Sequence, residues 1–229
     1  MCNRGDPPNP PSPRQQIVMY CMYAKQEEEE ENQAPEADIH NIVSTSLIKT
    51  DGPMIDMVGI TKQCPFTFYD KKKFAAITIR MGDPNCTALL FTSGKLVITG
   101  GTSWYECLLA AKYVCRLLKT IFPVVNFWVT SCDIQNIVGK SAIPMQEGCF
   151  LDIKKMYEEM NEMCTYQRTM FPGLIYRPEK SPVVILCFTS GRIVITGGKT
   201  PEDVYIGWKR LWCTVQKYIT SKTAANSSS

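Results

Sequence analysis

The sequence predicts a two-layer α+β fold made of two copies of one unit. Residues 91–101 (FTSGKLVITGG) return as residues 188–198 (FTSGRIVITGG), with nine of the eleven positions identical. Asn41-Ile42-Val43 likewise returns as Asn136-Ile137-Val138. Each copy also combines short strands with a well-marked closing helix. A tandem duplication predicts a pseudo-twofold molecule, whose natural ligand is itself nearly twofold.

Short strands separated by turn residues dominate both copies. In the first copy the pattern predicts strands over 38–47, 74–81, 87–92 and 96–99. In the second copy the matching strands are predicted over 131–139, 174–177, 183–189 and 193–196. A Ser-Gly turn precedes the last strand of each copy. Short strands joined by tight turns are typical of an antiparallel meander.

An internal helix is predicted in each copy before the meander. It covers 55–62 in the first copy and 152–164 in the second. Met156, Met160 and Met163 fall on one face of the second of these helices, as the helical period requires.

Each copy then closes with a helix whose start is clearly marked. Ser103 and Glu106 form a capping box in the first copy. Thr200, Pro201 and Asp203 take the equivalent places in the second. The apolar faces of the two helices are Leu108, Ala111, Cys115 and Leu118, and Val204, Trp208, Leu211, Val215 and Tyr218.

The 229 residues divide into a leader, two copies and a tail. Residues 1–37 hold seven acidic and three basic side chains among many Pro and Gln, which predicts a flexible acidic leader. The copies occupy 38–126 and 127–219 and carry a net charge of +6, and 220–229 is predicted to be a flexible tail. A modestly basic body suits a polyanionic partner.

Eleven scattered cysteines and a single histidine, His40, argue against several function classes. The cysteines lie in apolar runs without a CxxC pair, which is typical of reduced, buried thiols and not of disulfides or a zinc site. One histidine beside no nucleophile gives poor support for a hydrolase. Residues 17–24 form an apolar run too short to cross a membrane. We therefore expect no metal, no cofactor, no enzymatic activity and no membrane partner.

The strand residues that face away from the helices form an apolar face of their own. Leu90, Leu96 and Ile98 are predicted to lie beneath the helix, and the alternate positions are also mostly apolar. An exposed apolar sheet face predicts a binding surface or an oligomer interface. The alternative is a three-layer core with both faces covered, but two helices per copy are too few for it.

Five segments resemble the TATA-box-binding protein family. They read NIVST at 41–45, FAA at 74–76, TALLFTSGK at 87–95, QNIVG at 135–139 and FPGLIYR at 171–177. The resemblance covers about 38–219. It implies a saddle of two pseudo-symmetric repeats that share one curved antiparallel sheet, with helices on the convex face and DNA on the concave face. It also implies a role in transcription initiation in the nucleus, or at a viral replication site if the chain is virus-encoded.

The resemblance assigns a minor-groove floor to residues that alternate along the strands. In the minor groove an A·T pair shows only acceptors, and a G·C pair adds an amino group. An apolar floor tolerates the first and disfavours the second, while Asn and Thr side chains donate to the acceptors. The two asparagines also suit turns, but their repetition favours base contact. The floor residues are Asn41, Val43, Thr45, Leu89, Val97, Thr99, Asn136, Val138, Leu186, Val194 and Thr196.

Wedges and phosphate contacts follow from the same resemblance. Phe74 with Phe91, and Phe171 with Phe188, match the two pairs that insert between base steps, and the family is itself the standard example of such kinking. A lone strand phenylalanine is usually a core residue, but four at symmetric positions favour function. A lysine run at 71–73 suits a solvated loop, a weak nuclear signal or a phosphate contact. The implied phosphate contacts are Lys72, Lys73, Arg80, Ser93, Lys95, Arg177, Ser190 and Arg192.

The partner surfaces depart in part from the family pattern. Lys112, Arg116 and Lys119 on the first closing helix resemble the surface that meets transcription factor IIA. The glutamates that bind transcription factor IIB are replaced, because Gln167 and Thr169 stand in that segment. The expected partners are promoter DNA, factors resembling IIA and IIB, and the RNA polymerase machinery. Trp104 and Tyr105 suit either packing or a partner contact.

Three functions remain open from the sequence. The leading one is a general initiation factor that binds and bends TATA-like DNA and nucleates the preinitiation complex. The second is a related factor without TATA preference that acts mainly as a scaffold. The third is a nuclease accessory domain, which should also carry a cluster of metal-binding carboxylates, and the core sequence offers none.

Overall fold

Two similar series of strands and helices follow one another along the chain in a computed structural model that describes residues 34–53 and 55–221. The first series is β1 (Asp38–Thr50), α2 (Met57–Gln63), β2 (Thr67–Phe68), β3 (Ala76–Arg80), β4 (Thr87–Phe91), β5 (Lys95–Gly101) and α3 (Trp104–Ile121). The second is β6 (Phe127–Ala142), β7 (Cys149–Leu151), α4 (Ile153–Glu159), β8 (Cys164–Thr165), β9 (Leu174–Tyr176), β10 (Val184–Cys187), β11 (Arg192–Gly198), α5 (Pro201–Val215), a 3₁₀ turn (Gln216–Tyr218) and β12 (Ile219–Ser221).

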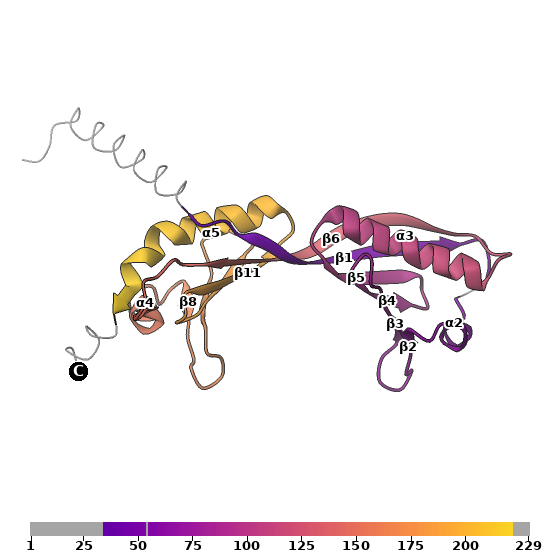
Figure 1. Ribbon diagram of the computed structural model, residues 1–229, viewed down its shortest axis with the longest axis horizontal. Helices are drawn as coiled ribbons and strands as arrows, with labels where there is room; N and C mark the ends of the chain where they lie inside the picture. The colour runs from indigo at the N-terminus through magenta and orange to yellow at the C-terminus, as the bar shows by residue number, and fades with distance from the viewer. Residues whose placement is uncertain (1–33, 54, 222–229) are drawn as a thin grey trace, which may run out of the picture.

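Ten of the strands form one antiparallel sheet in the order β2-β3-β4-β5-β1-β6-β11-β10-β9-β8. The order is two runs of five equivalent strands that meet at β1 and β6. Figure 1 shows the resulting saddle, with α3 and α5 along its upper side and one loop descending below each half. The two-layer α+β prediction is therefore confirmed, and the three-layer alternative is wrong, since the two long helices cover the same face.

A pseudo-twofold axis passes between β1 and β6. Ile42 pairs with Ile137 in the antiparallel register. On either side of this pair, Asn41 lies opposite Val138 and Val43 lies opposite Asn136. The two repeated Asn-Ile-Val segments therefore exchange places across the axis, and the duplication read in the sequence becomes the symmetry of the sheet.

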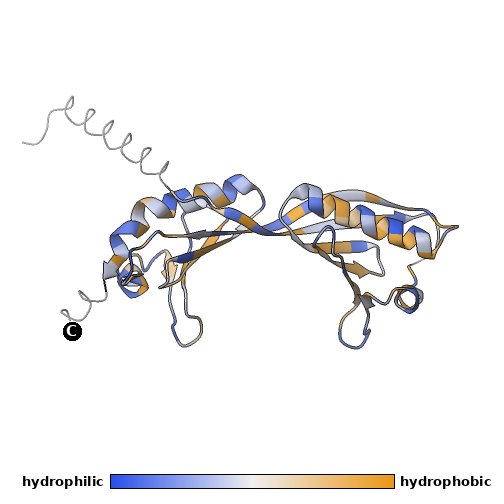
Figure 2. Ribbon diagram, viewed as in Figure 1, coloured by the Kyte–Doolittle hydropathy of each residue, from blue (hydrophilic) through white to orange (hydrophobic). Residues whose placement is uncertain are grey.

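The core lies between the upper face of the sheet and the long helices. Leu90, Leu96 and Ile98 are fully buried under α3, and the apolar stripe of that helix is visible in Figure 2. Burial of such side chains contributes on the order of 1.5–3 kcal/mol each. All five residues predicted for the apolar face of the second closing helix are buried, although Tyr218 lies in the 3₁₀ turn that follows α5. In α3 the prediction is wrong at Leu108, which is only half-buried, and Cys107 takes the buried position instead.

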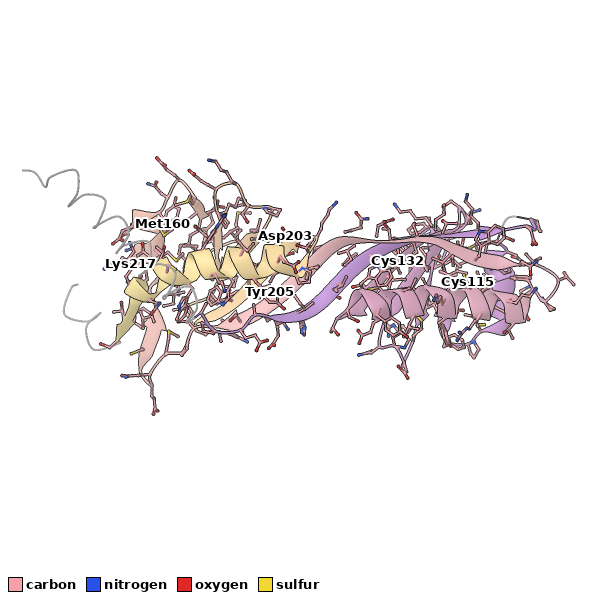
Figure 3. The ribbon with its side chains drawn as sticks, turned by 90° about the horizontal axis from the view of Figure 1, so that it is seen from above. Cys115, Cys132, Met160, Asp203, Tyr205 and Lys217 are labelled. Atoms are coloured by element: carbon pink, nitrogen blue, oxygen red, sulfur yellow. The ribbon has the colours of Figure 1, made fainter. Side chains whose placement is uncertain are left out.

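The start of each long helix is held by side-chain caps. Thr200 and Asp203 form the predicted capping box of α5, with Pro201 in the first turn, and Figure 3 shows Asp203 at the inner end of that helix. In α3, Ser103 accepts from the Glu106 N–H as predicted, and the Glu106 carboxylate accepts from the Thr102 N–H and hydroxyl. Backbone hydrogen bonds are the main cause that lowers the pKa of both carboxyls.

Several predicted boundaries are corrected. The strand expected over 131–139 is longer, because β6 pairs along most of β1. The helix expected over 152–164 ends at Glu159, and Met160 and Met163 lie in turns that still pack against the core. Phe74 precedes β3 instead of opening it.

Both ends of the described chain are more structured than the composition predicts. Residues 34–37 lie against α5, where the Trp208 indole donates to the Pro35 carbonyl at 2.7 Å and Ala37 is buried. At the other end, 219–221 forms β12, which pairs with β7. Packing thus overrides the flexible leader and tail at their inner ends. The apolar run at 17–24 and the rest of the leader lie outside the described residues.

Most of the cysteines within the described ranges are buried. Burial raises the pKa of three of the nine cysteines there, Cys86, Cys115 and Cys164, to about 11. No group of three or more potential metal ligands occurs among residues 34–53 and 55–221. In the same part of the chain no helix is long and apolar enough to cross a membrane.

Candidate nucleic-acid interface

The lower face of the sheet is a continuous half-exposed surface. In β4 and β5 buried residues alternate with half-buried ones, so Leu89, Val97 and Thr99 face away from α3. Cross-strand pairs join them, since Leu89 lies opposite Val97 and Val97 lies opposite Thr45. All eleven predicted floor residues are half-exposed strand residues of this kind. The structure therefore brings the whole predicted floor together on one concave face.

A phenylalanine pair lies at each end of this face. The ring centroids of Phe74 and Phe91 are 6.0 Å apart with an interplanar angle of 64°. Those of Phe171 and Phe188 are 5.8 Å apart, also at 64°. Edge-to-face contacts of this kind stabilise ring pairs by about 0.5–1.5 kcal/mol. Because the geometry is the same at both ends, the surface offers two matched pairs of apolar rings.

The same backbone hydrogen bonds and glycine turns position both phenylalanine pairs. The Phe74 N–H donates to the Asp70 carbonyl and the Phe171 N–H donates to the Gln167 carbonyl, each at 2.9 Å. The loops that present these residues are the stirrups, which we define as 69–75 between β2 and β3 and 166–173 between β8 and β9. Phe91 and Phe188 each precede a turn whose glycine has a positive φ, 82° at Gly94 and 78° at Gly191. Glycine adopts this conformation without steric cost, which explains why the Ser-Gly turn is repeated.

Two asparagine amides are oriented at the centre of the face. The Asn41 Oδ1 accepts from the Gly100 N–H at 2.7 Å, and the Asn136 Oδ1 accepts from the Gly197 N–H at 2.7 Å. The Thr99 and Thr196 hydroxyls also donate to these oxygens, at 3.1 and 3.3 Å. The oxygens are therefore used internally. The Asn136 Nδ2 also donates to the Thr196 hydroxyl at 3.2 Å, so the remaining amide N–H groups are the donors for a ligand. This arrangement suits a row of acceptor atoms above the pseudo-twofold axis.

Cationic and hydroxyl groups border the face. All eight predicted phosphate contacts are exposed, and they lie at strand ends, turns or stirrups. The Arg192 Nε donates to the Ser190 hydroxyl at 3.3 Å, so the two side chains are linked at the start of β11. In the first stirrup Lys73 pairs with Asp70 at 3.8 Å, an exposed ion pair of small energy. An apolar floor with basic edges matches the minor groove between its two phosphate backbones.

Comparison with known proteins agrees with this geometry. The family model described as "Transcription factor TFIID (or TATA-binding protein, TBP)" matches residues 36–121 and 131–218. The chain belongs to the TATA-binding protein family. The family is one of transcription factors and not of enzymes, so DNA binding at the TATA box and transcription initiation are its established setting.

Relatives from distant organisms share the two-repeat core. The TATA-box-binding protein of Acanthamoeba castellanii is 33% identical over 180 residues, which cover 79% of this chain and 66% of the relative. That of Saccharomyces cerevisiae is 32% identical over 180 residues, 79% of this chain and 71% of the relative. The structure of Methanococcus jannaschii TBP matches with a TM-score of 0.64 at 28% identity, covering 80% of this chain and 99% of that one.

The surfaces expected to meet protein partners of the family are exposed. Lys112, Arg116 and Lys119 lie on the outer side of α3, and Gln167 and Thr169 lie in the second stirrup. The Lys119 ammonium donates to the Asn126 side chain at 2.9 Å. Asn126 in turn donates to the Asp51 carboxylate at 2.8 Å through its N–H, which lowers the pKa of Asp51. The Trp104 indole donates to the Cys132 carbonyl, while the side chain is 49% exposed.

Three charged residues on the concave face lie outside the predicted set of site residues, although comparison of the two copies already sets Lys140 where the first copy has Thr45. Lys140 lies opposite both Val194 and Asp38, and Asp133 lies opposite Thr45. The available signal was the two-residue alternation in β6, which places Lys140 on the same side as Val138. The acidic partners follow only from the strand register.

Proposed function

We propose that this chain is a general transcription initiation factor that binds the minor groove of TATA-like promoter DNA and bends it. The observation that carries the proposal is the matched pair of phenylalanine wedges at the two ends of one half-exposed apolar face. Nothing in the packing of the core requires these four rings on the concave side. The two pairs lie in opposite halves of the ten-stranded sheet, so both can insert into one duplex.

The recognition chemistry follows from the groups on that face. The apolar floor lies against the edges of A·T pairs and disfavours the amino group of G·C pairs. Asn41 and Asn136 donate to base acceptors near the axis. Wedging costs a few kcal/mol of unstacking per step, which apolar contact with the bent duplex offsets. Flexible TA steps lower the cost of bending, so sequence is selected partly through deformability.

The bent complex would then nucleate the preinitiation complex in the nucleus. The exposed basic side chains of α3 favour a factor resembling IIA. Gln167 and Thr169 present an uncharged stirrup, so a factor resembling IIB would meet it through altered contacts. RNA polymerase would be recruited through these factors.

Fluorescence anisotropy with TATA-containing and G·C-rich duplexes, repeated at several salt concentrations, tests the proposal. We expect the TATA duplex to bind at least about 100-fold more tightly, because each mismatched pair costs about 1–3 kcal/mol. The logarithm of the affinity should fall with the logarithm of the salt concentration by about 0.9 per phosphate contact. Equal affinities would favour the scaffold function without TATA preference, and no binding to either duplex would overturn the proposal.

A further inference from the structure

The concave face is nearly symmetric in shape but not in charge. In the first half, the next residue of β1 on the concave face after Val43 is Thr45, which lies opposite Asp133. In the second half, the equivalent residue is Lys140, which lies opposite Asp38. The two aspartates correspond in the repeats, as do Thr45 and Lys140. The second half therefore holds an ammonium donor where the first half holds a hydroxyl.

The direction of Lys140 follows from its neighbours in β6. A Cβ atom on Gly139 would lie 2.5 Å from Val204 Cγ1 of α5, so position 139 faces the helix. Position 140 therefore faces the groove side, and Lys140 is exposed there. On the neighbouring strand β11, the residue opposite Lys140 is Val194, a floor residue. Lys140 is thus part of the surface that would meet DNA.

Lys140 lies inside the basic edge of this half and not on it. Arg192 pairs with Ala142, one same-face step further toward the end of the strands, and is held by Ser190. A hollow of about 330 Å³ beside the wedge is lined by Lys140, Phe188, Arg192 and Val194, among others. Arg192 and Ser190 therefore occupy the phosphate position, which leaves Lys140 facing the edges of the bases.

The first half offers acceptors at the equivalent place. The Thr45 hydroxyl accepts from the Gln135 amide at 2.8 Å, and the Asp133 carboxylate beside it is exposed. Carboxylate and hydroxyl oxygens can accept from the guanine amino group, the one donor in the minor groove. The ammonium of Lys140 can only donate, so it is matched to adenine N3 and thymine O2 and repelled by that amino group.

We propose that Lys140 reads A·T pairs under the second repeat, whereas Thr45 and Asp133 allow a G·C pair under the first, and that this difference sets the orientation of the chain on DNA. The inference rests on the proposed minor-groove function and adds a specificity-determining residue to it. Since Asp38 lies opposite Lys140, the pair adds no net charge, and its effect should be on sequence preference more than on salt dependence.

Orientation can be measured by energy transfer on a duplex whose TATA-like core is symmetric except for one G·C pair in one half. An acceptor fluorophore at the C-terminus of the full chain reports the second repeat, because β12 ends the described chain at that end of the saddle (Figure 1). Donors at either duplex end then report the two orientations. We expect the G·C half to lie under the first repeat with a preference of about tenfold, within the range for one discriminating base contact.

Lys140→Thr, which copies the first repeat, should bring this preference close to one, and Thr45→Lys should do the same from the other side. Lys199→Thr is the matched control: it removes one exposed lysine of the second repeat near the start of α5, and should leave the preference unchanged. A wild-type preference of one, or an unchanged preference in Lys140→Thr, overturns the inference. It is also overturned if Lys140→Thr weakens all duplexes equally and lowers the salt slope by about 0.9, which marks a phosphate contact. Absence of binding or bending by the wild type on every duplex would instead overturn the proposed function.

Discussion

The two wedge ends of the saddle have the same ring geometry but different supports. In the first repeat Phe74 is 48% exposed and is followed by two alanines. In the second, Phe171 is half-buried and is followed by Pro172 and Gly173. A Cβ atom on Gly173 would lie 2.8 Å from Phe171 Cε1 and 3.0 Å from Phe188 Cε1. The second pair therefore packs down onto its backbone, whereas in the first repeat Ala76 takes the place of Gly173 and lies opposite Phe91.

The stirrups that carry the wedges differ in charge. The first holds three lysines after Asp70, whose carboxylate accepts from the Lys72 N–H at 3.0 Å. The second holds Gln167, Arg168, Thr169 and Met170 at the equivalent places, and Met170 is 81% exposed. The geometry of the ring pairs is thus the same in the two repeats, while the residues beneath the rings and the charge of the stirrups differ. The first end is suited to gripping phosphates, and the second to apolar contact or a partner.

Removal of a wedge pair should have the largest effect. We expect Phe171→Ala with Phe188→Ala to weaken binding to a TATA duplex by about 100-fold, because each ring stacked on a base contributes on the order of 1–3 kcal/mol. Phe74→Ala with Phe91→Ala should cost the same within about threefold, since the ring geometry is the same. Anisotropy gives the affinities, and energy transfer between the duplex ends gives the bend.

Tyr105→Ala provides the control for this experiment, because it removes an exposed aromatic side chain from α3 on the opposite side of the sheet. Thermal unfolding of each variant separates lost binding from lost fold. If either double variant keeps both the affinity and the bend of the wild type, the wedge role of that pair is wrong.

A smaller effect should follow from a methyl group under the second pair. Gly173→Ala should displace the rings of Phe171 and Phe188 and weaken TATA binding by about tenfold, since overpacking costs about 1–3 kcal/mol. Ala76→Gly makes the reciprocal change in the first repeat and should leave binding within about threefold, because it crowds neither ring and costs only about 0.5–1 kcal/mol of folding stability. Unchanged binding and bending in Gly173→Ala would mean that the second pair swings freely instead of resting on its backbone.

The sequence was sufficient to place the site residues that follow the two-residue alternation of a strand or that recur in both copies. Alternation in the strands placed Val97 and Leu186 on the open face, and repetition identified Asn41 and Asn136 as a matched pair. It was not sufficient for α4, where the period of Met156, Met160 and Met163 continues through turns after the helix ends at Glu159. Side-chain spacing does not reveal where backbone hydrogen bonding stops.

Strand register was the other limit. The pairing of β1 with β6 shifts three times, between Ile39 and Asn41, between Val43 and Ser44, and between Ser46 and Ile48. A shift of one residue moves a side chain to the other face. Because the sequence does not show where these shifts fall, it could not place Asp38 opposite Lys140 or Asp133 opposite Thr45. The two copies in the sequence already set Thr45 against Lys140, but the acidic partners of these positions became visible only in the folded chain.

The smallest effect should come from exchanging the stirrup charges. Lys72→Thr copies Thr169 of the second repeat, and Thr169→Lys copies Lys72. With Lys72→Thr, the fall of log affinity with log salt should become less steep by about 0.9. With Thr169→Lys it should become steeper by a similar amount, because each phosphate contact releases about one counterion. Lys62→Thr, at the end of α2, is the matched control for lost charge. If Lys72→Thr leaves the slope unchanged while Thr169→Lys raises it, the first stirrup does not grip phosphate. The basic loop would then serve solvation, and the two ends would differ in partner binding alone.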